Sequence, residues 1–316
     1  MKNYYVSSVG GDIAQSIVRI LKSSYPHAIV FGTDLDHQNS GHEQVENFEV
    51  SPKASSAEYL PWLRDFLIRN NIDVFIPVNE NELEALALLS DTDFKNVLGS
   101  TSIIWAGPKA VRVFGNKRDT SDYLKTLGIK VPRVFSNPSD ILDTDYPVVV
   151  KPESGAGSRN IFLCGSIEEV NAAIVILPNC IIQQFIGDSG GEYTAGVFRS
   201  TVGEVRVIVF QRKLSGGATG WAKVIVNSDF ETLCTRVAES IDLNGSINIQ
   251  FRLDNGEPSI FEINGRFSST VMIRHILGFE DLLWSLGELA GFYEFDPLKV
   301  EGRIGYKVNR FAVRKM

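Results

Sequence analysis

The N-terminal third of the chain alternates short apolar runs with stretches in which apolar residues recur at helical spacing. The runs Tyr4–Ser8, Ala28–Thr33 and Val74–Val78 have the length and composition of buried strands. Between them, Ile13–Leu21 and Tyr59–Asn70 repeat apolar positions as amphipathic helices do. Strands that alternate with helices in this way predict βαβ units around a parallel sheet.

The pattern changes near Ala106–Pro108, where a short helical segment and then longer strands replace the strand-helix alternation. We therefore predict an α/β domain at residues 1–107 and an α+β part after it. The apolar run Cys180–Ile186 reads as a buried strand placed to link two lobes. This puts a small lobe at 108–183 and a larger C-terminal lobe at 184–316.

Two period-two runs near the C-terminus flank Asp254-Asn255-Gly256 and predict a β-hairpin. Pairing that is symmetric about the turn would put Phe251 opposite Phe261 on the buried face. Gln250 would then lie opposite Glu262 on the other face, roughly 5 Å away. Asn264 shares the face of Glu262, because side chains alternate along a strand.

One carboxylate and two amide oxygens would thus converge on one point, and oxygen ligands suit a hard cation. Mg²⁺ usually keeps several waters and takes further ligands from substrate phosphates. The hairpin therefore predicts a magnesium site made by Gln250, Glu262 and Asn264, with Arg266 just beyond it. The alternative is a half-exposed hairpin whose polar residues only face solvent.

A glycine-rich loop follows the apolar strand Tyr146–Lys151. Glycines let backbone N–H groups approach phosphate oxygens, and serines add hydroxyl donors. The phosphate-binding residues expected here are Lys151, Ser154, Gly155, Gly157 and Ser158. A Walker P-loop is excluded, because neither the G-K-[ST] sequence nor a following helix is present. The alternative is a mobile surface turn.

Three further segments carry open alternatives. Gly10-Gly11 opens a helix and Asp34 follows a strand, as in dinucleotide-binding folds, but the G-x-G-x-x-G spacing is absent. Glu80 and Glu82 are either substrate contacts or first-turn acids of a helix. The stretch 212–220 is either a second loop that closes on phosphate or acceptor through Arg212, or a solvated turn. Arg274 is either a substrate contact or a solvated helix residue.

Composition narrows the function classes. With 316 residues, 44% of them hydrophobic, the chain suits two or three packed lobes of a globular protein. A net charge of −7 with both signs scattered predicts no binding to nucleic acid or to an anionic membrane. No apolar run approaches the length of a membrane span, so a cytoplasmic location is expected. Three scattered cysteines support neither a disulfide framework nor a zinc site.

The order of these segments resembles the ATP-grasp superfamily. The residues that carry the resemblance are Lys117, Lys151 with its Gly/Ser loop, Gln184-Phe185-Ile186, Glu192, Asn248-Ile249-Gln250-Phe251 and Glu262-Ile263-Asn264-Gly265-Arg266. The last two motifs are similar to the metal-bearing strands of the ATP-grasp modules in the carbamoyl-phosphate synthetase large subunit. The resemblance implies an N-terminal pre-ATP-grasp domain followed by a two-lobed ATP-grasp fold.

The resemblance also implies roles. Lys117 and Lys151 would contact the α- and β-phosphates of ATP, and the glycine-rich loop would cover them. Gln184, Phe185 and Ile186 would hold the adenine and Glu192 the ribose. Gln250, Glu262 and Asn264 would ligate Mg²⁺, for which Mn²⁺ can substitute. Arg266 would steady the transferring phosphoryl group, and Arg212 is a second catalytic candidate.

The implied activity is an ADP-forming ligase that joins a small-molecule carboxylate to an amine through an acyl phosphate. The alternatives are a carbamoyl-phosphate-synthetase-like kinase of a carboxylate or carbamate, and an ATP-binding regulatory protein without turnover. A homodimer is left open. The sequence does not identify the acceptor carboxylate, the amine or the pathway.

Overall fold

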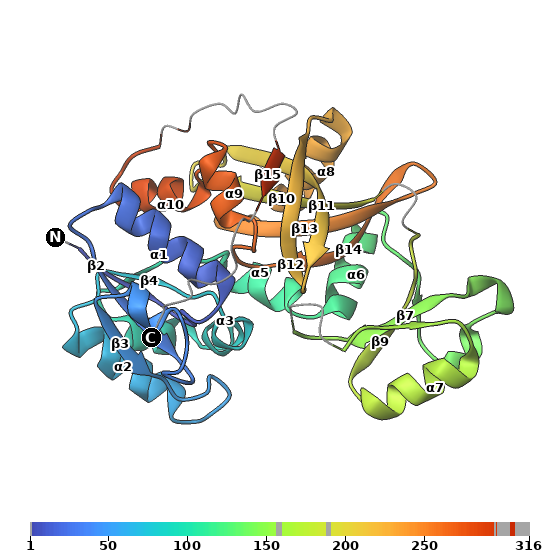
Figure 1. Cartoon of the computed structure of the whole chain (residues 1–316), viewed down its shortest axis with the longest axis horizontal. Coiled ribbons are helices and arrows are strands. Elements are labelled where there is room, and N and C mark those ends of the chain that lie inside the picture. The colour runs from blue at the N-terminus through green and yellow to red at the C-terminus, as the bar shows by residue number, and fades with distance from the viewer. Residues whose placement is uncertain (1, 156–159, 188–190, 294, 296–303, 307–316) are drawn as a thin grey trace.

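The computed structural model describes residues 2–155, 160–187, 191–293, 295 and 304–306. Three β-sheets follow one another along the chain (Figure 1). The first is parallel, with strand order β3-β2-β1-β4-β5. Its strands are β1 (Asn3–Val6), β2 (Ile29–Asp34), β3 (Asn47–Val50), β4 (Val74–Ile76) and β5 (Ser102–Ile103). Its helices are α1 (Asp12–Ser24), α2 (Tyr59–Arg69), α3 (Glu80–Ala87) and α4 (Asp91–Leu98). The predicted βαβ domain is confirmed.

The second sheet is small and antiparallel, with strand order β6-β9-β7-β8. It consists of β6 (Val134–Phe135), β7 (Val148–Pro152), β8 (Phe162–Cys164) and β9 (Cys180–Gln184). Helix α7 (Ile167–Ile176) packs against it through Val170 and Ala173, which join the apolar cluster of the sheet. This sheet and helix form the small lobe at the right of Figure 1.

The third sheet is antiparallel, with strand order β14-β13-β10-β11-β12-β15. Its strands are β10 (Glu192–Arg199), β11 (Val205–Ser215), β12 (Ala218–Ile225), β13 (Gly245–Asp254), β14 (Glu257–Asn264) and β15 (Ile304–Tyr306). Helix α8 (Ser228–Ser240) packs against β10 and β11. A parallel sheet followed by two antiparallel sheets confirms the predicted fold class.

Helices α5 (Gly107–Phe114) and α6 (Lys117–Thr126) share a core with the six-stranded sheet. Phe114 and Leu124 belong to the same apolar cluster as Ile249 of β13. These helices therefore pack with the large lobe, although the sequence-based division puts them in the small one. The division at residues 107 and 183 stays a prediction.

Helices α9 (Val271–Ile276) and α10 (Asp281–Leu289) join the large lobe to the N-terminal domain. Val271 and Leu282 lie in one apolar cluster with Ile17 of α1 and Val6 of β1. Burial of this shared apolar surface fixes the N-terminal domain against the large lobe, which matters because part of the site lies between them.

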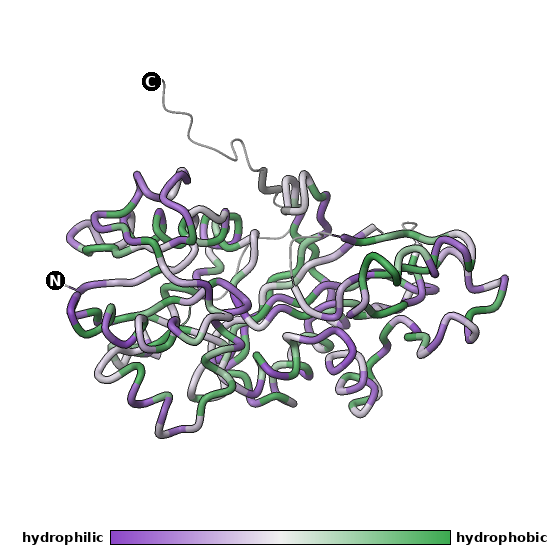
Figure 2. The backbone as a smooth tube through the Cα atoms, turned by 90° about the horizontal axis from the view of Figure 1, so that it is seen from below, coloured by the Kyte–Doolittle hydropathy of each residue, from purple (hydrophilic) through white to green (hydrophobic). Residues whose placement is uncertain are grey.

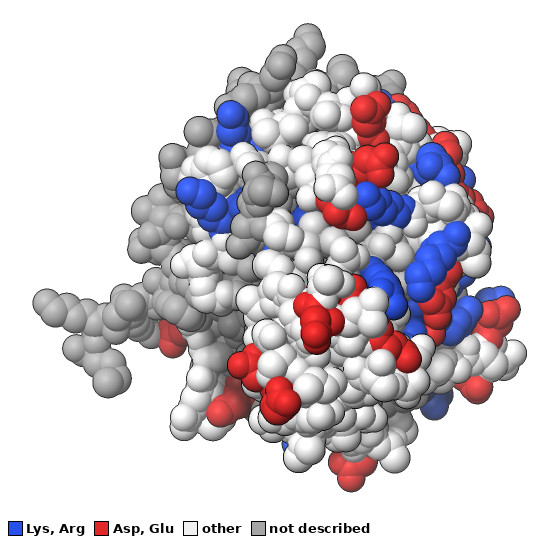
Figure 3. Space-filling model, turned by 90° about the vertical axis from the view of Figure 1, so that its right-hand side faces the viewer, with Lys and Arg blue, Asp and Glu red and all other residues white. Residues whose placement is uncertain are grey.

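Polar and apolar positions alternate along the backbone of all three parts (Figure 2). In the part of the chain that the structure describes, no helix is long and apolar enough to cross a membrane. Lys, Arg, Asp and Glu side chains lie interspersed on the face that carries the small lobe (Figure 3). Among the described residues visible there, the basic side chains form no continuous patch of the kind that nucleic-acid binding requires.

Candidate functional site

A cavity of about 340 Å³ lies between the small lobe and the six-stranded sheet. Eight of the predicted site residues line it: Lys151, Gln184, Phe185, Ile186, Glu192, Arg212, Gln250 and Glu262. They come from β7, β9, β10, β11, β13 and β14 and from the segment after β9. The fold thus brings together residues that are far apart in the sequence and that were predicted to meet one nucleotide.

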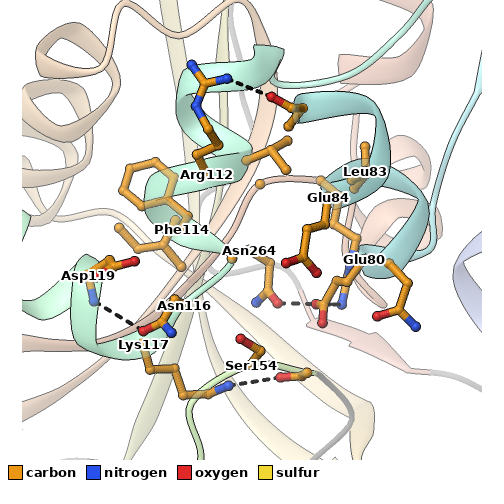
Figure 4. Close-up of a pocket in the computed structure, with 18 of the residues that line it drawn as sticks. Glu80, Leu83, Glu84, Arg112, Phe114, Asn116, Lys117, Asp119, Ser154 and Asn264 are labelled. Carbon is orange, nitrogen blue, oxygen red and sulfur yellow. Dashed lines mark hydrogen bonds and ion pairs between the residues drawn. The ribbon is translucent and has the colours of Figure 1, made fainter. Parts of the chain in front are cut away.

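A second cavity, of about 250 Å³, lies on the other side of Glu262. It is bounded by α3 of the N-terminal domain, by α5, by the start of α6 and by the end of the hairpin (Figure 4). The predicted residues that line it are Lys117, Ser154, Gly155, Glu262, Asn264 and Arg266. Glu262 lines both cavities, so its carboxylate lies where they meet.

The hairpin has the predicted pairing at the end that carries the proposed metal ligands. Gln250 lies opposite Glu262, and Asn264 is two residues further along β14. The pairing of Phe251 with Phe261 is wrong, since the register shifts after Gln250 and Phe251 lies opposite Ile260. This β-bulge leaves Phe261 as the extra residue of its strand. Phe261 then lines the larger cavity beside Glu262 instead of joining the core.

The Glu262 carboxylate is the strongest candidate for a cation ligand. None of the described residues donates a hydrogen bond to it, and the described residues contain no group of three His, Cys, Asp or Glu that could hold a metal alone. Gln250 Oε1 accepts a hydrogen bond from Arg212 Nη2 at 2.6 Å, and Asn264 Oδ1 accepts one from Arg266 Nη2 at 3.5 Å. One free carboxylate beside two amide oxygens fits Mg²⁺ that also takes phosphate ligands.

Lys151 is buried beneath the hairpin, with 5% of its surface exposed. Its Nζ donates a hydrogen bond to the carbonyl oxygen of Phe261 at 3.2 Å and lies 5.4 Å from the centre of the Phe261 ring. Burial lowers the pKa of Lys151 to about 8, although the nearby Glu262 carboxylate opposes that shift. The amine is therefore held one residue from Glu262, and a bound anion would favour its charged form.

ATP affinity should depend on pH through this lysine. Phosphate oxygens favour the charged amine, so ATP binding above a pKa of about 8 must take up a proton. We expect the dissociation constant for MgATP to be about tenfold higher at about pH 9 than at about pH 7.5. Calorimetry at the two pH values measures it. Lys151→Arg keeps its charge throughout and should remove this dependence, whereas a dependence that persists in Lys151→Arg would assign it to another group.

Lys117 begins α6, which Asn116 caps by accepting hydrogen bonds from the backbone N–H groups of Arg118 and Asp119. Lys117 Nζ donates to the carbonyl oxygen of Gly155 at 2.9 Å, and Asn116 pairs with Ser154 as an isolated β-bridge. The start of α6 thus holds the start of the glycine-rich loop. The predicted residues Gly157 and Ser158 lie outside the described residues.

The predicted adenine segment is tied to the hairpin by a residue that the sequence reasoning missed. Arg252 Nη1 donates to the carbonyl oxygen of Ile186 at 3.0 Å, and its guanidinium lies over the Phe185 ring at 5.4 Å. Arg252 follows Gln250 by two positions and so shares its face of β13. That spacing was the available signal. Gln184 Oε1 accepts a hydrogen bond from the backbone N–H of Arg133 at 3.2 Å.

Glu192 is held between two arginines. Its Oε1 accepts from Arg212 Nη2 at 2.5 Å, and its Oε2 accepts from Arg252 Nη2 at 2.8 Å. Burial alone would raise the pKa of Glu192, but the two guanidinium groups hold it below its ordinary value. Arg212 also reaches Gln250, so the predicted ribose acid and a predicted metal ligand are linked. The ribose role of Glu192 stays a prediction.

The structure places the residues for which alternatives were left open. The stretch 212–220 continues β11 and β12 as a hairpin, so it is no separate loop, and only Arg212 and Leu214 of it line the larger cavity. Arg274 is fully buried against Asp281 at 2.8 Å and is neither a substrate contact nor solvated.

In the N-terminal domain, Asp34 accepts a hydrogen bond from the backbone N–H of Gly10 at 2.8 Å. Glu82 is also buried, where it accepts hydrogen bonds from Ser7 and Tyr59.

The central part of the chain matches a known family, described as the ATP-grasp domain, over residues 114–270. Residues 114–270 form an ATP-grasp domain. This match begins at the end of α5, contains the small lobe, and in the large lobe ends just after the hairpin, before α9. It confirms the superfamily, whereas the closer resemblance to carbamoyl-phosphate synthetase stays a prediction.

Known ATP-grasp proteins and folds are similar to larger parts of the chain. The D-alanine--D-alanine ligase of Fusobacterium nucleatum is 27% identical over 207 residues, which are 61% of this chain and 67% of that protein. The matched segments cover from 12% to 67% of the relatives' own lengths.

Solved structures extend the similarity to almost the whole chain. N5-carboxyaminoimidazole synthetase from Staphylococcus aureus has a TM-score of 0.68 at 15% identity, and the match covers 96% of this chain and 80% of that one. The biotin carboxylase domain of the Hydrogenobacter thermophilus 2-oxoglutarate carboxylase was solved with MgADP and bicarbonate. Its TM-score is 0.69 at 14% identity, with 95% and 71% covered. These TM-scores show that the chain shares a fold with both structures, around the ATP-grasp domain.

Proposed function

We propose that the protein is an ATP-dependent, ADP-forming ligase that joins a small carboxylate to an amine through an acyl phosphate. The observation that carries the proposal is the position of the buried Lys151 amine against the backbone of Phe261, next to the Glu262 carboxylate, to which no described residue donates a hydrogen bond. A cation for phosphate and an anion for metal, side by side where two cavities meet, suit phosphoryl transfer.

In this proposal, each of the two cavities binds a different substrate. The larger cavity takes the adenosine, which lies beside Phe185 and Ile186. The segment 184–186 and Arg252 support the adenosine there. The smaller one takes the acceptor carboxylate, because it lies beyond Glu262 and is lined by Arg266. The γ-phosphoryl group would then lie at the junction.

Each residue has a separate role in the transfer. Bound Mg²⁺ would be held by Glu262, Gln250 and Asn264, and would offset the negative charge of the phosphates. Lys151 binds phosphate oxygens from below, and Lys117 binds them from the start of α6. Arg266 stabilises the charge that develops on the transferring group, because its guanidinium is already oriented before the reaction.

The bonds change in two steps. A carboxylate oxygen of the acceptor attacks the γ-phosphorus, the bond from that phosphorus to the bridging β–γ oxygen breaks, and ADP leaves. The nitrogen of the amine then attacks the acyl carbon, phosphate leaves with the carbon–oxygen bond electrons, and the nitrogen loses a proton. No covalent bond to the protein is needed.

The test is a screen of paired carboxylates and amines, including amino acids, for stimulated release of ADP and phosphate. We expect release to need MgATP, a carboxylate and an amine together, and the product to contain a new amide bond by mass spectrometry. Release that needs the carboxylate alone and yields a stable acyl phosphate would favour a kinase. ATP binding with no acceptor-stimulated release across the screen would contradict the ligase proposal.

A further inference from the structure

An ion pair joins the N-terminal domain to the end of the metal-binding hairpin. Arg266 Nη2 lies 2.7 Å from Glu80 Oε1, and the two residues are 186 positions apart in the sequence. Their side chains are 9% and 31% exposed, so the arginine is the buried partner. The sequence reasoning named both residues but did not pair them. In Figure 4, Glu80 and Asn264 approach the same cavity from different elements.

The remaining contacts of Arg266 fix the plane of its guanidinium. Nη1 donates to the carbonyl oxygen of Phe267 at 2.9 Å, and Nη2 also reaches Asn264 Oδ1 at 3.5 Å. Nε has no hydrogen-bond partner among the described residues. A guanidinium has five N–H donors in a rigid fork. After these contacts, the buried Nε–H and one N–H of Nη1 have no partner among the described residues, and Glu80 uses neither of them.

Helix α3, which begins with Glu80, is held firmly enough to act as a support. Leu83 and Ala87 on α3 pack with Val111 on α5 in one buried apolar cluster. At the other end of the helix, Arg112 Nη1 donates to the carbonyl oxygen of Ala87 at 2.6 Å. The packing of these residues therefore holds the backbone of α3, and with it the base of the Glu80 side chain, in place beside Arg266.

We propose that Glu80 is a positioning residue for Arg266, through which the N-terminal domain sets the orientation of the guanidinium toward the transferring phosphoryl group. The inference rests on the proposed function, since it needs Arg266 to meet that group. It explains why a carboxylate lies beside the smaller cavity, close to the junction proposed for the γ-phosphoryl group. Its charge opposes phosphate, but it removes the cost of orienting a long side chain during the reaction.

The opposite role for Glu80 is competition, in which Arg266 must leave the carboxylate before it can bind phosphate. Positioning predicts that loss of the carboxylate weakens the interaction with the γ-phosphate. Competition predicts that the same loss strengthens it. The contacts of Arg266 favour positioning, because one N–H of Nη1 has no partner among the described residues and is separate from the Nη2 that binds Glu80.

The experiment is Glu80→Gln, alone and in an Arg266→Gln background. We expect kcat to fall about tenfold in the single variant, with the KM for ATP changed by less than about threefold. The preference for ATP over ADP in equilibrium binding should fall as well, and that readout needs no acceptor. In the Arg266→Gln background, Glu80→Gln should have no further effect, because the group that it positions is gone.

Glu49→Gln is the matched control. Glu49 is also in the N-terminal domain, is 36% exposed and pairs with Arg69 at 2.5 Å, away from both cavities. It should leave kcat and the ATP preference unchanged. Glu80→Asp keeps the charge and supplies the comparison if Glu80→Gln does not fold. A Glu80→Gln protein with unchanged or higher ATP preference, or an equal loss in both backgrounds, would overturn the proposal. A wild type without ligase activity would contradict the proposed function alone, because the ATP preference tests the positioning role without an acceptor.

Discussion

Glu262→Gln should lower turnover at least about a hundredfold while the protein keeps its fold. Glu262 supplies the only carboxylate among the three proposed metal ligands, and no described residue donates a hydrogen bond to it. Glutamine keeps the shape but removes the charge that holds Mg²⁺ against the phosphates. ATP affinity should fall less, because Lys151 and the segment 184–186 still bind the nucleotide.

The measurement is ADP release with an identified acceptor, beside a melting curve of each protein. Glu257→Gln is the matched control, because Glu257 begins the same strand, is 74% exposed and pairs with Lys130 far from the cleft. That variant should turn over normally. A Glu262→Gln protein that melts and turns over like the wild type would show that the hairpin is not the metal site.

Glu192→Gln should lower the free energy of unfolding by about 3 kcal/mol. Glu192 is the shared partner of Arg212 and Arg252, whose side chains are 7% and 19% exposed. Removal of the carboxylate takes an ion-pair partner away from each of two largely buried cations, and that costs more than loss of an exposed pair.

Urea denaturation of the wild type and Glu192→Gln measures this difference. Arg212 and Arg252 hold the pKa of Glu192 low against the effect of burial, so the carboxylate stabilises the fold above its unfolded pKa. That stabilisation decreases as pH falls from the ordinary pKa of a glutamate through the lower pKa of folded Glu192, and the two proteins should approach equal stability only below that lower pKa. Glu204→Gln, which removes an exposed ion pair with Arg206 on the same sheet, should cost less than about 1 kcal/mol. Equal costs at both positions would show that the arginines do not depend on Glu192.

Local sequence patterns were sufficient to predict a structural feature that one short segment forms by itself. The turn at Asp254-Asn255-Gly256 and the alternation on each side predicted both the hairpin and the opposition of Gln250 and Glu262. The same alternation could not show the bulge after Gln250, because an extra residue leaves the composition of each face almost unchanged. Phe261 was therefore assigned to the core, whereas it lies beside Lys151.

The ion pairs between charged side chains could not be predicted from local sequence patterns. Glu192 could be placed near a nucleotide by its order in the chain, but its two arginines lie on other strands. Glu80 and Arg266 were each noted as polar residues near a strand end, and nothing in either segment points to the other. Each charge has many possible partners in a sequence, and only the packing of distant elements selects one.

The sequence by itself determined the parallel N-terminal domain, the strands of the hairpin and the resemblance to ATP-grasp proteins, because periodicity, turn residues and motif order are properties of short segments. Only the tertiary structure decided that α5 and α6 pack with the large lobe, that Glu262 lies between two cavities, and that Glu80 holds Arg266. Those features depend on which apolar surfaces are buried together, and burial is settled by the whole chain at once.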